Sequence, residues 1–251
     1  MVTSVDLNCD LGEGCGNDAE LMQYISSANV ACGFHAGDET TMRQTVALAL
    51  EHGVAIGAHP GYRDRENFGR TELSLPRHEV RRLILDQLEL LNAECERLGA
   101  KIRHVKPHGA LYNQAAKDID LAHMIAEAVA EFDPDLTLFG SSGSSLISEA
   151  QAVGLKTASE VFADRTYRSD ATLTPRTQAD ALISDTESSL TQVLNMIKYG
   201  RVRSTDSIMV PINAQTICIH GDGPNAVNFA RSIRERLIAE GITVEAPDSA
   251  R

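Results

Sequence analysis

The stretch VDLNCDLGEG, residues 5–14, joins a short strand-like run to a polar, glycine-rich segment, and this order recurs along the chain. Residues 5–9 are expected to form the first strand. Six further strands are predicted at 29–32, 54–58, 102–106, 136–139, 156–158 and 216–219. Most of these runs are followed by a loop and then by a segment of helical periodicity, which is the pattern of βα units.

The segments between the strands have apolar residues at helical spacing. Helices are predicted at 40–51, 78–98, 118–131, 145–152, 176–199 and 225–239. In 78–98 the apolar stripe includes Val80, Leu83, Ile84 and Leu88, and Gly99 supplies a stop. A further apolar run at 208–212 is a candidate for an inserted strand before the last one.

Alternating strands and helices predict a mainly parallel sheet with right-handed crossovers. About seven units in 251 residues suit a closed β/α barrel better than two separate domains, and no linker-like tract divides the chain. We therefore expect one barrel domain over residues 1–251. An open, doubly wound sheet is the alternative.

The composition excludes several classes of partner. Lys and Arg number 23 and Asp and Glu 35, so the net charge is −12, which argues against binding nucleic acid or an anionic membrane. The N-terminus has no signal-peptide pattern, and no apolar run approaches a membrane span. The five cysteines are odd in number and have no CxxC spacing, so we expect a cytoplasmic protein without a disulfide framework.

Polar residues gather where the predicted strands end, which is the active face of a parallel barrel. They are Asn8, Asp10 and Glu13; His35 and Asp38; His59; Lys106, His108, Tyr112 and Asn113; Glu160, Asp164, Arg165 and Arg168; His220 and Asp222. Each has an ordinary explanation alone: Asp10 or Asp38 could cap a helix, and Lys106 could form a surface ion pair. Together they predict one cleft equipped for acid–base or metal-assisted hydrolysis.

The remaining histidines are assigned differently. His52, His78 and His123 fall on predicted helix surfaces, and His104 lies inside a strand, where a structural role is expected.

Glycine-rich loops adjoin these polar groups. GSSGSS at 140–145 and HGDGP at 220–224 each lead into a predicted helix, so they could hold a phosphate or carboxylate, although ordinary turns would have the same sequence. The long segment 60–76 contains Arg63, Asp64, Arg65, Phe68 and Arg70 and is a candidate lid or wall. The ATP-binding motif GxxxxGK[ST] is absent from the sequence, as are GxGxxG, HExxH and a nucleophile elbow.

Six blocks together resemble the signature of the LamB/YcsF family. They are DLNCDLGE, NVACGFHAGDETTM, GAHPGYRDRENFGR, HVKPHGALYN, EVFADRTY and TICIHGD, and they run in order from residue 6 to residue 222. The resemblance implies a distorted seven-stranded β/α barrel, similar to that of carbohydrate deacetylases. Thr71, Ala171, Ala179 and Gln215 depart from the family pattern beside these blocks.

The characterised members of this family are the A subunit of prokaryotic ATP-dependent 5-oxoprolinase. The resemblance therefore implies hydrolysis of 5-oxo-L-proline with ATP to L-glutamate, ADP and phosphate, in a complex with subunits B and C. Since the sequence has no ATP cradle, we expect phosphorylation to occur mainly on the partners, with ATP as co-substrate of the complex. Homo-oligomerisation stays open.

Under this hypothesis most of the strand-end residues receive a role. Asp10, His59 and His108 would handle water and protons, Lys106 would stabilise negative charge, and Arg70 or Arg165 would bind the substrate carboxylate or phosphate. Asn8 and Tyr112 would also contact the substrate. The surrounding shell would consist of His35, Asp38, Glu160, Asp164, His220 and Asp222.

Two other functions stay open. One is a divalent-metal hydrolase of the deacetylase type, with Asp10, His35, His59 and His220 as candidate ligands. The other is a non-catalytic subunit that binds substrate for a catalytic partner.

Overall fold

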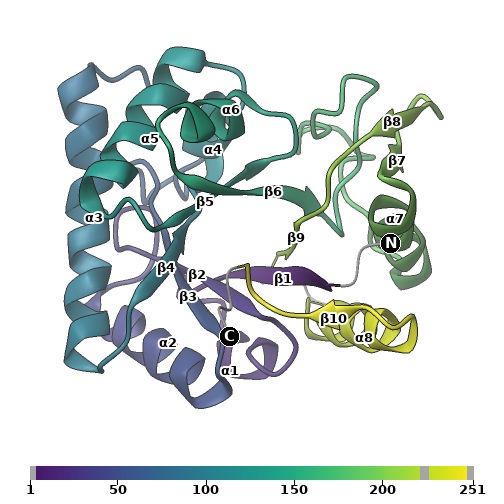
Figure 1. Cartoon of the computed structure of the whole chain (residues 1–251), viewed down its shortest axis with the longest axis horizontal. Coiled ribbons are helices and arrows are strands. Elements are labelled where there is room, and N and C mark those ends of the chain that lie inside the picture. Colours follow the sequence, from purple (N-terminus) through teal and green to yellow (C-terminus); the bar gives the residue numbers. More distant parts are fainter. Residues whose placement is uncertain (1–3, 221–225, 248–251) are drawn as a thin grey trace.

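Seven parallel strands form a closed barrel (Figure 1) in the computed structural model, which describes residues 4–220 and 226–247. In barrel order they are β1 (Ser4–Leu11), β2 (Ser27–Ala31), β3 (Ala55–His59), β4 (Ile102–Val105), β5 (Thr137–Ser141), β6 (Lys156–Phe162) and β9 (Thr216–Ile219). The barrel closes because β9 pairs with both β6 and β1. The predicted barrel and all seven of its strands are thus confirmed, in place of the open sheet.

The barrel interior is partly polar. Asn29 of β2 is in register with Gly57 of β3, and Gly57 is in register with His104 of β4. A Cβ atom on Gly57 would lie 2.0 Å from His104 Nε2, so only glycine leaves room for the imidazole. That ring stacks on Phe139, its Nε2 donates to Asn29 Oδ1 at 2.8 Å, and burial lowers its pKa to about 3. His104 is therefore a neutral structural residue, as the sequence predicted.

Helices surround the barrel (Figure 1). The longer ones are α2 (Glu39–His52), α3 (Arg77–Arg97), α5 (Ile119–Phe132), α6 (Ser145–Ala152), α7 (Thr186–Tyr199) and α8 (Ala226–Ala239). In α3 the predicted stripe, including Val80, Ile84 and Leu88, is buried, and α3 packs between α2 and α5. Two short helices were not predicted: α1 (Asp18–Leu21) and α4 (Gly109–Ala115). Among the described helices, none combines the length and the apolar composition needed to cross a bilayer.

The prediction of a helix at 176–199 was wrong in its first part, because α7 begins at Thr186. Asp185 caps α7 by accepting a hydrogen bond from Ser188 N at 2.8 Å. The residues before it form an irregular segment, which Arg165 holds by donating to the carbonyls of Thr174 and Ala181. These tertiary contacts outweigh the local helical periodicity.

Within residues 4–220 and 226–247, three strands lie outside the seven-stranded barrel. The predicted inserted strand is found as β8 (Met209–Pro211), which pairs antiparallel with β7 (Arg201–Arg203) beside α7. The short strand β10 (Thr243–Val244) extends the sheet at the start of β1. Neither β7 nor β10 was predicted.

Candidate active site

A cavity of about 690 Å³ opens at the carboxyl ends of the barrel strands. The predicted site residues that line it are Asp10, His59, Arg70, Lys106, His108, Tyr112, Arg165 and His220. Further lining comes from Glu13, Glu72, Lys117, the loop 141–144 after β5, and residues 170–177. The strand ends therefore converge on one cavity, as a barrel requires.

Lys106, directly after β4, is held by groups from three other strands. Its Nζ lies 2.9 Å from Asp10 Oδ1, 2.8 Å from Glu160 Oε1 and 3.1 Å from Cys218 Sγ. Burial favours a lower pKa for this ammonium, but Asp10, Cys218 and Glu160 outweigh it, so the pKa lies well above its usual value. Its donors serve these neighbours and Asn8, so Lys106 holds the two carboxylates in place, and its predicted contact with a developing oxyanion stays a prediction.

Asn8 and Glu160 lie beneath the cavity. Asn8 Nδ2 donates to Glu160 Oε1 at 2.9 Å and to Thr216 Oγ1 at 2.7 Å. Its Oδ1 accepts from Asn29 Nδ2 at 2.7 Å and from Lys106 Nζ at 3.2 Å. The amide thus has protein partners for both its donors and its acceptor, and contact between Asn8 and the substrate stays a prediction. Glu160 is buried against the Asn8 amide and the Lys106 ammonium.

Tyr112 links this buried network to the cavity that it lines. Its hydroxyl donates to Glu160 Oε2 at 2.6 Å. Burial first, and then Glu160, raise the pKa of the phenol well above its usual value, so Tyr112 stays protonated.

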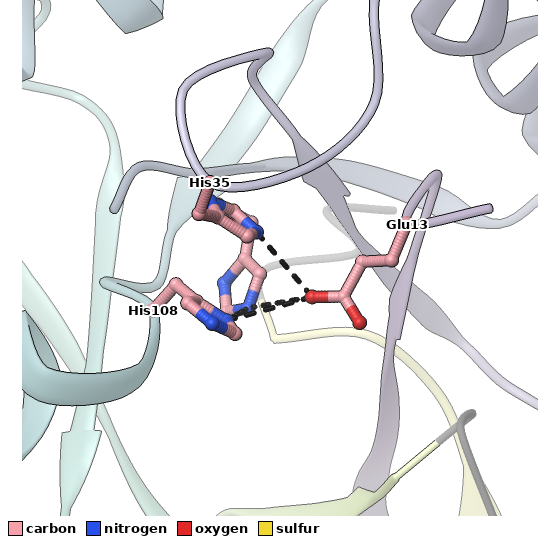
Figure 2. Close-up of side chains that lie close together, drawn as sticks. Glu13, His35 and His108 are labelled. Carbon is pink, nitrogen blue, oxygen red and sulfur yellow. Dashed lines mark hydrogen bonds and ion pairs between the residues drawn. The ribbon is translucent and has the colours of Figure 1, made fainter. Parts of the chain in front are cut away.

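Three imidazoles and a carboxylate form a compact cluster at one side of the cavity (Figure 2). Glu13 Oε1 lies 3.4 Å from His35 Nε2, 3.8 Å from His59 Nε2 and 3.5 Å from His108 Nδ1. The rings of His35 and His108 stack in parallel with centroids 3.9 Å apart. Glu13 was noted at a strand end but received no role from the sequence. Glu13 lies close to three histidines that end or follow other strands, and only the folded structure shows this proximity.

The protonation of this cluster is set by burial and by its own charges. Burial first, and then His59, lower the pKa of His35 and of His108 to about 2, so both rings are neutral. Burial also favours a lower pKa for His59, but the Asp10 carboxylate outweighs burial and raises the pKa of His59 above its usual value. Asp10 Oδ2 lies 3.5 Å from His59 Nε2. The pKa of Asp10 lies well below normal because His59 and Lys106 outweigh the effect of burial.

The segment 60–76 forms a wall against these histidines. Phe68, in a left-handed conformation with φ of 56°, accepts a hydrogen bond on its carbonyl from His108 Nε2 at 2.9 Å. A Cβ atom on Gly69 would lie 2.8 Å from His35 Cβ, and one on Gly61 would lie 2.7 Å from His35 Nδ1. The glycines therefore permit close approach of the wall to His35.

Near Asp10, Asp164 holds His220, which also lines the cavity. Both carboxylate oxygens of Asp164 lie 2.9 Å from His220 Nδ1. The His220 ring stacks on Phe162 with centroids 5.6 Å apart. Burial favours a higher pKa for Asp164, but His220 outweighs it, so the pKa of this carboxyl is lowered. The pair has the arrangement of an oriented general base.

Two of the predicted site residues that the structure describes do not join this arrangement. Asp38 is exposed and caps α2 by accepting from Thr41 N at 2.8 Å, which was the alternative explanation for it. Arg165 lines the cavity, but it donates to the backbone carbonyls of Thr174 and Ala181, which makes it an anchor of the 163–185 segment. Asp222 lies outside the described residues. The helix-surface histidines His52 and His78 are exposed, as expected.

Comparison with known proteins gives matches over nearly the whole chain. The LamB/YcsF family model matches residues 5–251. The chain is 54% identical to the A subunit of 5-oxoprolinase from Staphylococcus carnosus (strain TM300) over 245 residues, which is 96% of this chain and 97% of that protein.

Solved structures give the same picture. A lactam utilization protein from Thermus thermophilus is 42% identical, with a TM-score of 0.91 over 97% of this chain and 100% of that one. The peptidoglycan deacetylase PdaC of Bacillus subtilis, at 13% identity and a TM-score of 0.53, covers 97% of this chain and 87% of its own. At that identity the match shows a shared fold only.

Proposed function

This chain belongs to the LamB/YcsF family, and from that premise we propose that it is the A subunit of an ATP-dependent 5-oxoprolinase. In the proposed reaction, 5-oxo-L-proline, ATP and two water molecules give L-glutamate, ADP and phosphate. The hydrolytic ring opening takes place in the cavity at the carboxyl ends of the strands. The name of the 54% identical relative, a 5-oxoprolinase component, supports the choice of substrate.

Within the molecule, the observation that carries this proposal is the Asp164–His220 pair at the cavity wall. A lactam resists hydrolysis because its nitrogen donates electrons into the carbonyl. Phosphorylation of the lactam oxygen would remove that resistance and turn the oxygen into a leaving group. The enzyme must then activate a water molecule and return a proton to the ring nitrogen.

The two ring nitrogens of His220 have different roles in activating the water molecule. Nδ1 is held by Asp164, so Nε2 is the atom that can take a proton from the attacking water. The water oxygen forms a bond to the ring carbon that carries the phosphorylated oxygen. As the carbon–nitrogen bond breaks, the nitrogen takes up a proton and becomes the amino group of glutamate. This step leaves an acyl phosphate of glutamate. A second water molecule attacks its carbonyl carbon, and phosphate departs as the second carboxylate forms.

Positive and neutral donors on the cavity wall suit an anionic substrate. Arg70, Lys117 and Arg176 line the cavity, and so does the loop 141–144 ahead of α6. Ser144 Oγ is buried without a hydrogen-bond partner among the described residues. We assign this wall to the carboxylate and phosphoryl groups, since a helix N-terminus and guanidinium groups both favour anions.

Phosphorylation is assigned to the partner subunits B and C, because the sequence has no phosphate-binding loop for ATP. Hydrolysis of ATP by the isolated chain would contradict this division of labour. A cytoplasmic location agrees with the five free thiols of Cys9, Cys15, Cys32, Cys95 and Cys218.

The proposal is tested by omission. Glutamate formation from 5-oxoproline and ATP is measured with the three subunits together, and again with each one left out. We expect glutamate only from the full mixture. If the full mixture forms no glutamate, or forms it at the same rate without this chain, the proposed function is wrong.

A further inference from the structure

Two imidazole nitrogens face each other in the cluster of Glu13, His35, His59 and His108. His59 Nε2 and His108 Nδ1 lie 2.9 Å apart. The opposite nitrogen of each ring lies next to a backbone carbonyl: His59 Nδ1 is 2.7 Å from Lys106 O, and His108 Nε2 is 2.9 Å from Phe68 O. A carbonyl can only accept, so each of these outer nitrogens carries the proton. The two inner nitrogens therefore face each other, and the space between them can hold a proton or a metal ion.

Two carboxylates also border the space between these nitrogens. Glu13 Oε1 lies 3.5 Å from His108 Nδ1, and Asp10 Oδ2 lies 3.5 Å from His59 Nε2. His35 Nε2 lies 3.4 Å from Glu13 Oε1, so four possible ligand atoms, from Glu13, His35, His59 and His108, converge on one space. We propose that Glu13, His35, His59 and His108 bind a divalent metal ion of the zinc class.

The spacing of the ligand atoms fits this proposal. Around a tetrahedral zinc ion with bonds of about 2.0–2.1 Å, neighbouring ligand atoms lie roughly 3.3–3.4 Å apart. The distances from Glu13 Oε1 to the three imidazoles are 3.4, 3.8 and 3.5 Å, and the two facing imidazoles are 2.9 Å apart. These values scatter around the tetrahedral spacing. All four ligand atoms lie within 4.8 Å of one another.

Neighbouring backbone groups hold the possible ligands in fixed orientations. Carbonyls of Lys106 and Phe68 fix the orientation of two ligand rings, which is how outer-shell contacts orient metal-bound histidines. Three imidazoles with one carboxylate form a donor set that suits zinc and its neighbours rather than magnesium or calcium.

A second group of possible ligands does not fit a metal. Asp10, Cys218 and His220 also lie within reach of a common point. However, Lys106 Nζ is 2.9 Å from Asp10 Oδ1 and 3.1 Å from Cys218 Sγ, so an ammonium already occupies that space. The set predicted from the sequence therefore changes: Glu13 and His108 take the places of Asp10 and His220.

The test is metal content, measured on the full chain without partners or substrate. The chain is stripped with a chelator, incubated with Zn²⁺, dialysed and analysed for bound metal. We expect about one zinc per chain. The variants Glu13→Gln and His108→Gln should bind zinc at least tenfold more weakly in competition with a chromophoric chelator. His220→Ala, which alters the other group, should bind it as tightly as the wild type.

Two further readouts guard against misfolded variants. Far-UV circular dichroism checks the fold of each variant, and Zn²⁺ should raise the melting temperature of the wild type but not that of Glu13→Gln. Co²⁺ should give the visible absorption of a four-coordinate site in the wild type only. The proposal is overturned if the wild type retains no zinc, if both ligand variants bind it as tightly as the wild type, or if His220→Ala loses it. None of these outcomes depends on the proposed reaction, because no turnover is measured.

Discussion

Both carboxylate oxygens of Asp164 lie 2.9 Å from Nδ1 of His220, and the pair stands at the wall of the cavity beside Phe162. The carboxylate fixes which nitrogen of the imidazole is free to accept a proton. Asp164→Asn keeps the shape but can present an N–H to the ring, which favours the wrong tautomer. We expect kcat of the three-subunit mixture to fall by about 10²–10⁴ with little change in KM.

The matched control for this prediction is Asp180→Asn, an exposed carboxylate on the same 163–185 segment. It should leave both constants unchanged. An Asp164→Asn complex with normal kcat, or one whose KM alone rises, would show that Asp164 does not orient a catalytic imidazole.

Lys106 is predicted to carry much of the stability of the barrel interior. Lys106→Met removes the ammonium between Asp10 and Glu160 and leaves two buried carboxylates without their cation. Breaking a buried ion pair on one side costs about 3–5 kcal/mol, and we expect this loss in urea unfolding at neutral pH. The control Lys198→Met breaks the pair with Glu240 at the surface and should cost about 0–1 kcal/mol. Equal losses for the two variants would refute the prediction.

Gly57 and His104 are predicted to be energetically coupled. Gly57→Ala places a methyl group 2.0 Å from His104 Nε2, within a packed interior that cannot yield without strain. We expect a loss of about 1–3 kcal/mol or more in the free energy of unfolding. In the double variant Gly57→Ala/His104→Ala the methyl group has room, so the total loss should be smaller than the sum of the single losses. Strict additivity would contradict the packing that we describe.

Asp6 is predicted to make the stability of the chain depend on pH. Burial raises its pKa from the ordinary value of 3.8 to about 6, and hydrogen bonds from Ser26, Thr216 and Ser27 offset this only in part. The folded state therefore holds the proton more tightly than the unfolded state, so the contribution of Asp6 to stability is greatest below pH 3.8 and is lost as the pH rises through 6. The difference between these two values corresponds to roughly 3 kcal/mol.

The measurement compares the wild type with Asp6→Asn, which cannot ionise. The wild-type free energy of unfolding minus that of the variant should fall by roughly 2–3 kcal/mol between about pH 4 and pH 8. A difference that is constant over this range would show that Asp6 does not titrate in this way.

The sequence predicted the barrel because each strand is a short run followed by a helix of clear periodicity. It failed at residues 176–185, where the periodicity is helical but the Arg165 contacts to the backbone hold an irregular segment. The expectation that polar residues at the strand ends form the site identified most of the cavity lining, including His59, His108 and His220. It could not separate Asp38, a helix cap, from Asp10, since both follow a strand and only the fold shows which side chain turns inward.

The contacts of Glu13 and Lys106 could not be predicted from the sequence for a related reason. Both depend on which residues of distant strand ends become neighbours, and this is set by the register of the closed barrel. Lys106 has partners from β1, β6 and β9, and Glu13 meets histidines that follow or end three other strands.

The central claim is that ring opening is catalysed in this cavity and that the chain does not merely carry substrate to its partners. The most direct measurement is the rate of glutamate formation by the three-subunit mixture with His220→Ala in place of the wild-type chain, after gel filtration shows that the complex assembles. We predict that glutamate formation falls by at least about 10². Wild-type turnover by the assembled His220→Ala complex would contradict the account.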